Sequence, residues 1–262
     1  MKRLHFRYEM RLQMSQDVTD HHFLLRLRPM EDGQQACEAF EYRIEPADTV
    51  DEVWDGFGNR GYSGAVRRLH RLFSAVSEGI VTVDRGIPVR EGLHPMYRFP
   101  SRYTEPEADV VALYQELCKE LPVDSTDKTA FVAVTMERLY RCFSYAPGIT
   151  TVHTTAAEAL RGGSGVCQDY AHILISLCRL AGIPARYVAG MMMGEGATHA
   201  WVEVWLDGHW QGLDPTHDRP VDESYIKLTH GRDFGDGTVD KGCFIGFAAQ
   251  QQQIHIKVEE VE

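Results

Sequence analysis

Three motifs between residues 165 and 216 decide the fold of this chain: GVCQDYAH at residues 165–172, HAWVEVW at residues 199–205 and WQGLDPT at residues 210–216. The first motif opens an apolar run of helical period that ends at Gly182 and Pro184, a common way for a helix to stop. The other two flank Asp207-Gly208, a strong signal for a two-residue hairpin turn. This order predicts a helix over residues 167–181, a buried strand over 187–193 and a hairpin over 199–214.

The predicted helix begins at Cys167, so this thiol lies at the positive end of the helix dipole, next to unpaired backbone N–H groups. Both features favour thiolate over thiol and therefore predict a nucleophilic cysteine. Gly162, Gly163 and Gly165 allow a tight, exposed approach to the helix, where backbone N–H groups can form part of an oxyanion hole. Cys178 lies inside the same helix on its apolar side and gains none of this.

The predicted hairpin brings an imidazole to a carboxylate. If Asp207-Gly208 forms a two-residue turn, His199 and Asp214 share one face of the hairpin as diagonal neighbours, with β-carbons roughly 5–8 Å apart. A hydrogen bond can span that separation, unless a one-residue bulge breaks the register. Asp214 would then orient His199, and His199 would take the proton from Cys167.

In this order the motifs, together with GIPARYVAG at residues 182–190, resemble the catalytic core of bacterial transglutaminase-like proteins. The resemblance covers at least residues 145–216 and extends toward 96–250. It implies a papain-like α+β core with Cys167 as nucleophile, His199 as base and Asp214 as third member of the triad. The family includes protein crosslinkers, peptidases and deamidases, so the resemblance fixes the chemistry better than the substrate.

The first part of the chain has the pattern of antiparallel β structure. Apolar side chains fill every second position from Leu4 to Met14, and the same period returns at residues 23–27 and 40–44. Turn signals between them predict an antiparallel β-sandwich. The stretch DGFGN at residues 55–59 is also similar to the β domain that precedes the core in bacterial transglutaminase-like proteins.

Prolines in a polar context between residues 95 and 106 mark the connection that follows. We therefore predict two domains, an N-terminal β-sandwich over residues 1–95 and a transglutaminase-like catalytic domain over residues 96–262. Apolar side chains at helical spacing predict three further helices, over residues 107–121, 127–143 and 155–160.

Composition narrows the function classes. A net charge of -11 argues against nucleic acid and against an anionic membrane surface as partners. The N-terminus has no continuous apolar core and so is not expected to be a signal peptide, and no stretch approaches the ~18 apolar residues of a membrane helix. Six scattered cysteines without CxxC pairs favour a reducing cytoplasm.

Other titratable residues near the three candidates have less specific interpretations. Asp169 and His172 are close to Cys167 in the helix, where structural roles are commoner than direct participation. Tyr145 could donate to an oxyanion, although core packing is the favoured interpretation. Twelve histidines occur without an HExxH motif or a Cys/His cluster of ligand spacing, so neither a metal nor another cofactor is expected.

The sequence thus predicts a Cys-His-Asp thiol enzyme that cleaves amide or peptide bonds of a protein or peptide through a thioester, with water as the final acceptor. Water is favoured because the loop between the predicted strand over 187–193 and the hairpin, residues 194–198, is too short to form a lid that excludes water. The rivals are acyl transfer to an amine, as in crosslinking transglutaminases, and a non-catalytic protein-binding scaffold. RGGSGVC at residues 161–167 is also similar to arylamine acetyltransferases, but the downstream motifs fit these less well. The oligomeric state stays open.

Overall fold

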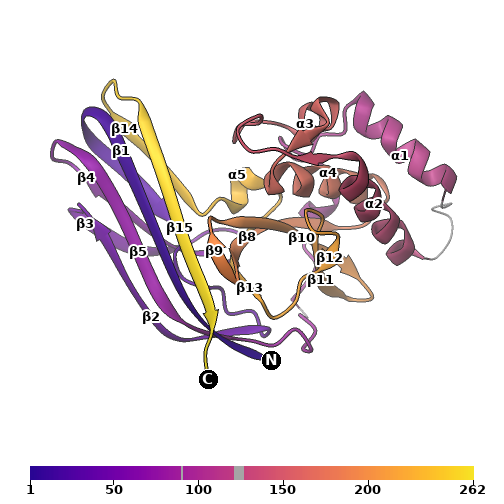
Figure 1. Ribbon diagram of the computed structural model, residues 1–262, viewed down its shortest axis with the longest axis horizontal. Helices are drawn as coiled ribbons and strands as arrows, with labels where there is room; N and C mark the ends of the chain where they lie inside the picture. Colours follow the sequence, from indigo (N-terminus) through magenta and orange to yellow (C-terminus); the bar gives the residue numbers. More distant parts are fainter. Residues whose placement is uncertain (90, 121–126) are drawn as a thin grey trace.

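The protein combines a curled antiparallel sheet with a second, smaller sheet that carries helices, an α+β architecture (Figure 1). The computed structural model describes residues 1–89, 91–120 and 127–262. Both chain termini lie near the same end of the curled sheet. Within the described ranges, no helix is long and apolar enough to cross a bilayer.

The curled sheet is built on one long strand, β1 (Lys2–Leu25). The first half of β1 pairs with β5 (His70–Val83) on one edge and with β15 (Gln250–Glu260) on the other. Its second half pairs with β4 (Arg60–Val66) and β14 (Asp240–Ile245) on the same two edges. The predicted alternation is confirmed, since five of its apolar side chains are buried: Leu4, Phe6, Tyr8, Met10 and Met14.

The remaining strands of this sheet lie at its edges: β2 (Gln35–Glu45), β3 (Thr49–Trp54) and β9 (Gly194–Gly196). The pairing of β1 shifts register between Gln13 and Val18 against β5, and between Thr19 and His22 against β14. These irregularities lie near the middle of β1, where shifts of this kind bend a strand. The sequence predicted a sandwich of two sheets, but the strands form one eight-stranded sheet that curls into a half-barrel, because β1 runs through both halves.

The last strands of the chain complete this first sheet. β14 and β15 supply hydrogen-bond partners for one whole edge of β1, more than 200 residues away in sequence. Residues 240–260 therefore pair with the N-terminal strands, although they belong to the second unit, 96–262, of the predicted division. The division into two domains stays a prediction.

The second sheet is antiparallel, in the order β12-β11-β10-β8-β13. Its strands are β8 (Ala185–Met192), β10 (His199–Leu206), β11 (His209–Asp214), β12 (Arg219–Pro220) and β13 (Tyr225–Gly231). Helices cover one face of it (Figure 1), and α4 packs directly on β10 and β8. The helices are η1 (Pro95–Arg98), α1 (Ala108–Glu120), α2 (Lys128–Cys142), α3 (Ala156–Gly162), α4 (Cys167–Leu180) and α5 (Phe234–Gly237).

Local signals set most of these boundaries as the sequence predicted. The Asp127 carboxylate caps α2 by accepting from the Ala130 N–H at 3.0 Å, and Thr155 with Glu158 forms a capping box at the start of α3. Gly182 follows α4 with φ 66°, as expected at a helix end. The predicted end of α1 at residue 121 lies outside the described residues.

A buried carboxylate joins the central strands of the second sheet. Glu203 on β10 contacts Arg186 on β8 at 2.6 Å and Lys227 on β13 at 2.9 Å. Burial alone raises the pKa of Glu203, but the two cations outweigh burial and hold it well below its usual 4.5. The Lys227 ammonium also lies 3.4 Å from the Asp32 carboxylate, in the loop after β1. This cluster links both sheets.

A second polar joint connects the sheets through the DGFGN turn. Its Asp55 carboxylate accepts hydrogen bonds from the Phe57 and Asn59 N–H groups at 2.9 Å. The Asn59 side chain also donates to the His230 carbonyl at 2.7 Å and accepts from the His230 N–H at 2.8 Å. This turn of the curled sheet is therefore locked onto β13.

We predict that Glu203→Gln destabilises the fold by about 3 kcal/mol, because two buried cations lose the carboxylate that they share and each keeps one other carboxylate partner, Glu91 for Arg186 and Asp32 for Lys227. Urea unfolding at neutral pH measures this. The carboxylate's contribution is present above the usual pKa of 4.5 and is lost as the pH falls below it, so the wild type and variant should converge in acid. Asp17→Asn, which breaks an exposed pair with Arg71, is the control and should leave stability unchanged. Equal stability of Glu203→Gln and wild type at neutral pH would contradict this role.

Candidate active site

Cys167 is the first residue of α4 and is partly exposed. The approach to it is fixed by a short parallel pairing, in which β6 (Ser144–Tyr145) lies beside β7 (Ser164–Gly165). Gly165 has no room for a side chain, since a β-carbon there would lie 2.4 Å from an Asp169 carboxylate oxygen. The predicted glycine requirement before Cys167 therefore has a steric cause.

Asp169 holds the start of α4 in place. Its Oδ2 accepts from the Val166 N–H at 2.8 Å and from the Thr150 hydroxyl at 2.7 Å. Burial raises the pKa of this carboxyl, although both hydrogen bonds act against the rise. Asp169 thus caps the helix and anchors the segment around Thr150, which agrees with its structural interpretation.

His172 is likewise engaged in packing. Its Nε2 accepts from the Phe234 N–H at 3.1 Å, and its ring stacks on Tyr103 with centroids 5.3 Å apart. Burial, assisted by the Arg179 charge, lowers the pKa of His172 to about 3, so the ring is neutral. It joins α4 to α5, and these contacts are structural.

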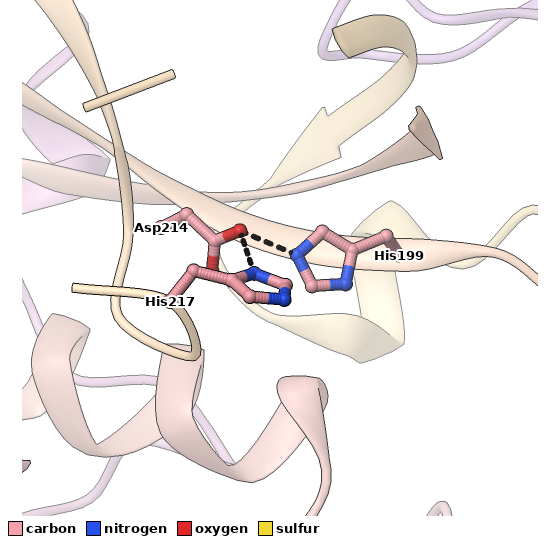
Figure 2. A group of neighbouring side chains, drawn as sticks. All are labelled: His199, Asp214 and His217. Carbon is pink, nitrogen blue, oxygen red and sulfur yellow. Dashed lines mark hydrogen bonds and ion pairs between the residues drawn. The ribbon is translucent and has the colours of Figure 1, made fainter. Parts of the chain in front are cut away.

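The hairpin brings His199 and Asp214 together as its register predicted. Asp207 and Gly208 both have positive φ, 52° and 80°, and no bulge interrupts the ladder from Leu206 up to Val202. His199 Nε2 lies 2.7 Å from Asp214 Oδ2 (Figure 2).

The third candidate residue, Cys167, lies near this pair. Cys167 and His199 line the same cleft, and because His199 Nε2 is taken by Asp214, Nδ1 is the nitrogen available for the thiol. Burial by itself lowers the pKa of His199, but Asp214 and the nearby Cys167 raise it to about 9. The three sequence-predicted residues thus lie at one site, with His199 bonded to Asp214 and close to Cys167.

Asp214 has more partners than the sequence indicated. Its Oδ2 also lies 2.7 Å from His217 Nδ1 (Figure 2) and accepts from the Tyr225 hydroxyl at 2.8 Å. Its Oδ1 accepts from the Thr216 N–H at 3.0 Å. Burial alone raises the pKa of Asp214, but the bonds from His199, His217 and Tyr225 bring it well below its usual value. The carboxylate is therefore ionised and fixed in position.

His217 and Tyr225 were missed by sequence reasoning for different reasons. His217 follows Asp214 by three residues, so the turn that places it on the carboxylate was a readable signal. Tyr225 comes from β13, a strand that does not pair with β11. Nothing local in the sequence connects the two.

The same cluster has the composition of a metal site. His199, Asp214 and His217 each offer one ligand atom, and these atoms lie within 4.8 Å of one another. A cation bound there would take the Asp214 oxygen and the His199 nitrogen out of their mutual hydrogen bond. One set of atoms can thus orient an imidazole or hold a metal. The expectation of no metal stays a prediction.

A cleft of about 1150 Å³ opens at Cys167 and His199. Tyr145 lines it and is 55% exposed, so core packing, the favoured interpretation of this residue, is wrong. The reason is β6, which pairs its two residues with β7 at the cleft and leaves both exposed. Burial raises the pKa of the Tyr145 hydroxyl, as does the nearby Cys167, so the phenol stays protonated.

All six cysteines are free thiols, in different surroundings. Cys178 is fully buried, and burial raises the pKa of its thiol to about 12. Cys142 and Cys243 are exposed. Only Cys167 lies at a helix start with a histidine partner.

Comparisons with known proteins identify the family of the chain. Residues 98–215 match the model of the transglutaminase-like superfamily, and residues 4–82 match that of the bacterial transglutaminase-like N-terminal region. An uncharacterised protein of Mycobacterium tuberculosis is 32% identical over 243 residues, which covers 80% of this chain and 77% of the relative.

A protein-glutamine gamma-glutamyltransferase of Pseudomonas aeruginosa is 32% identical over 121 residues, 38% of this chain and 18% of that protein. Among solved structures, a Cytophaga hutchinsonii protein provisionally named a cysteine protease superposes with a TM-score of 0.81. That alignment has 22% identity and covers 100% of this chain and 91% of that one, which indicates the same fold. The chain is a member of the transglutaminase-like superfamily, and it carries a bacterial transglutaminase-like N-terminal region before the core.

Proposed function

We propose that this protein is a thiol hydrolase that cleaves amide bonds in peptides or proteins, with Cys167 as nucleophile, His199 as acid and base, and Asp214 as the group that orients the imidazole. One observation carries the proposal. His199 hydrogen-bonds an ionised, fixed Asp214 and lies near Cys167, at the wall of a cleft large enough for a polypeptide segment.

The first half-reaction forms a thioester. The Cys167 thiolate adds to the amide carbonyl carbon, and the carbonyl oxygen becomes an oxyanion. We assign the Cys167 backbone N–H, at the start of α4, and the Tyr145 hydroxyl, which lines the cleft, as the donors to this oxyanion. The C–N bond then breaks, and the leaving nitrogen takes the proton from His199, so that an amine departs and the acyl group stays on sulfur.

The second half-reaction regenerates the thiol. Neutral His199 takes a proton from a water molecule while the water oxygen adds to the thioester carbon. The C–S bond then breaks, the carboxylic acid leaves, and the sulfur departs as thiolate beside the newly formed imidazolium. Asp214 remains ionised in both halves, because its charge stabilises the imidazolium without accepting its proton.

Hydrolysis is the acceptor step that we favour over transfer to an amine. The segment between β8 and β10 is short, and β9 within it is held on β15, so it does not form a lid over Cys167. Water, at roughly 55 M, then competes well with any amine that lacks a positioned site. The gamma-glutamyltransferase name of the Pseudomonas aeruginosa relative keeps amine transfer as the second candidate.

The papain-like description of the core belongs to the same proposal. Its support is the pairing of a cysteine at a helix start, on α4, with a histidine and an aspartate on the antiparallel sheet against which that helix packs. A cytoplasmic location also stays a proposal, supported by the scattered, free cysteines.

The acceptor is tested by product analysis. A tryptic digest of casein is incubated with enzyme and a millimolar primary amine, in a Cys142→Ser, Cys243→Ser background that removes the exposed thiols. We expect new peptide termini or glutamate in place of glutamine, and a loss of at least about a thousandfold in Cys167→Ala. Predominant amine adducts would identify a transferase. No product, together with no alkylation of Cys167 by iodoacetamide, would favour the protein-binding scaffold.

The pH dependence tests the role of His199. Leaving-group protonation needs the imidazolium, which is present below its pKa of about 9, so kcat/KM should fall as the pH rises through about 9. Asp214→Asn removes the charge that raises this pKa, and the alkaline limb should move to lower pH. An identical limb in both proteins would contradict the assignment.

His217 is expected to act as a positioning residue through Asp214. Removing its hydrogen bond in His217→Ala should lower kcat/KM about 3–10-fold, the effect of one hydrogen bond of ordinary net strength at a partly exposed site. The alkaline limb should shift as well, because one partner of Asp214 is lost. His217→Asn keeps an N–H donor near the Nδ1 position and should restore both readouts. Equal behaviour of the alanine and asparagine variants would contradict the role.

A further inference from the structure

The last strand of the curled sheet has a free edge. β14 and β15 pair with β1 along one side, and β9 pairs with the other side of β15 only at residues 256–258. Within the described part of the chain, no strand pairs with the outer side of β14 or with that of β15 at residues 250–255, and residues 246–249 between the two are not in a strand. A row of backbone donors and acceptors is therefore exposed there.

The direction of each backbone group follows from three hydrogen bonds to β1. The Val239 carbonyl accepts from the N–H of residue 26, just after β1, at 2.7 Å. The Ala249 carbonyl accepts from the N–H of residue 15 at 2.9 Å, and the Val261 N–H donates to the carbonyl of residue 3 at 2.9 Å. Residues at odd positions therefore face β1, and residues at even positions face outward. The outward-facing residues of the free stretch that line the cleft are Asp240, Gly242, Gln250, Gln252 and Ile254.

This free edge borders the same cleft as Cys167 and His199. In Figure 1, β15 stands at the side of the curled sheet that faces the helices and the second sheet. β9 lies on the edge of β15 and is followed within three residues by His199. A strand added to the edge next to β9 would therefore run in the cleft toward the candidate nucleophile.

The edge also lacks the usual protection against pairing. Residues 240–254 contain no proline, and their only charged side chains are Asp240 and Lys241 at one end. β14 and β15 do not form one straight row, because the Gln252 side chain donates to the Asp240 carboxylate at 2.8 Å and brings the start of β14 beside β15. The available row is that of β15, which begins with four glutamines, at residues 250–253, whose side chains are exposed.

From this geometry we infer that the substrate is an extended polypeptide segment that binds as an added β-strand on residues 250–254 of β15, in line with β9. The inference rests on the proposed function and names its substrate class. Main-chain hydrogen bonds give such binding its affinity with little dependence on side chains. It also gives the N-terminal region a role, since the wall of the substrate cleft is then the edge of the half-barrel.

The experiment compares matched alkylating probes on the protein with Cys142→Ser and Cys243→Ser. The probe is a hexapeptide of alternating threonine and valine that carries an iodoacetyl group at its N-terminus or, in a second version, on a C-terminal lysine. A control probe has the same sequence with N-methyl groups at alternate positions, which removes strand pairing but keeps the electrophile. We expect the plain probe in one orientation to label Cys167 about tenfold faster than its N-methylated control, as one or two net hydrogen bonds provide.

Two variants at one position separate the backbone from the side chain. Gln252→Pro removes an outward N–H from the edge, whereas Gln252→Ala keeps it, and both lose the side-chain bond to Asp240. The rate advantage of the plain probe should vanish in Gln252→Pro and persist in Gln252→Ala, with the iodoacetamide rate unchanged in both. Equal rates for the plain and N-methylated probes in the unsubstituted protein would overturn the inference.

A second readout does not depend on the thiol. The same hexapeptide without the iodoacetyl group should slow hydrogen exchange at the amides of Gln250, Gln252 and Ile254. If iodoacetamide fails to label Cys167, the proposed function fails, and exchange protection still decides whether the edge binds peptide. No protection, or a dimer in sedimentation that Gln252→Pro dissociates, would show that a peptide substrate is not the occupant.

Discussion

The arrangement of the second sheet depends on one buried carboxylate. Glu203 lies between Arg186 and Lys227, so the three central strands β8, β10 and β13 are joined by charge as well as by their backbone ladders. A buried ion needs this compensation, because an unpaired one would cost several kcal/mol. His199 stands on β10 four residues before Glu203, so the strand that this cluster fixes is also the one that carries the imidazole. Through Asp32, the cluster extends to the curled sheet.

Asp214, inside the site, is a second buried carboxylate that its neighbours stabilise. Four donors converge on one carboxylate, and each of them restricts the position from which it can hold His199. A single histidine–aspartate bond would leave the ring free to turn about it. With His217 and Tyr225 added, the carboxylate is ionised, buried and immobile, which is the preorganised charge that an imidazolium requires. The same convergence explains why these atoms also have the spacing of a metal site.

The curled sheet and the site meet along β15. Because β1 is long and bent, its partners also follow the bend, and the C-terminal edge is carried past the opening of the cleft. β9 then ties the segment before His199 to that edge. A half-barrel that only stabilised the core would not need an unprotected edge at this place. The joint geometry supports a division of labour in which α4 and the hairpin supply the chemistry and the half-barrel supplies the substrate wall.

The sequence by itself determined the features that short-range patterns control. The period of two, with a two-residue turn at Asp207-Gly208, was sufficient to put His199 beside Asp214, since register in a tight hairpin leaves one solution. Capping residues and glycines fixed where the helices begin and end. Tertiary structure alone decided that β14 and β15 return to β1, that β1 curls one sheet instead of dividing two, and that Tyr225 reaches Asp214. The physical reason is that alternation tells which face of a strand is buried but not which distant strand will satisfy its edge, and that choice is made only when the whole chain packs.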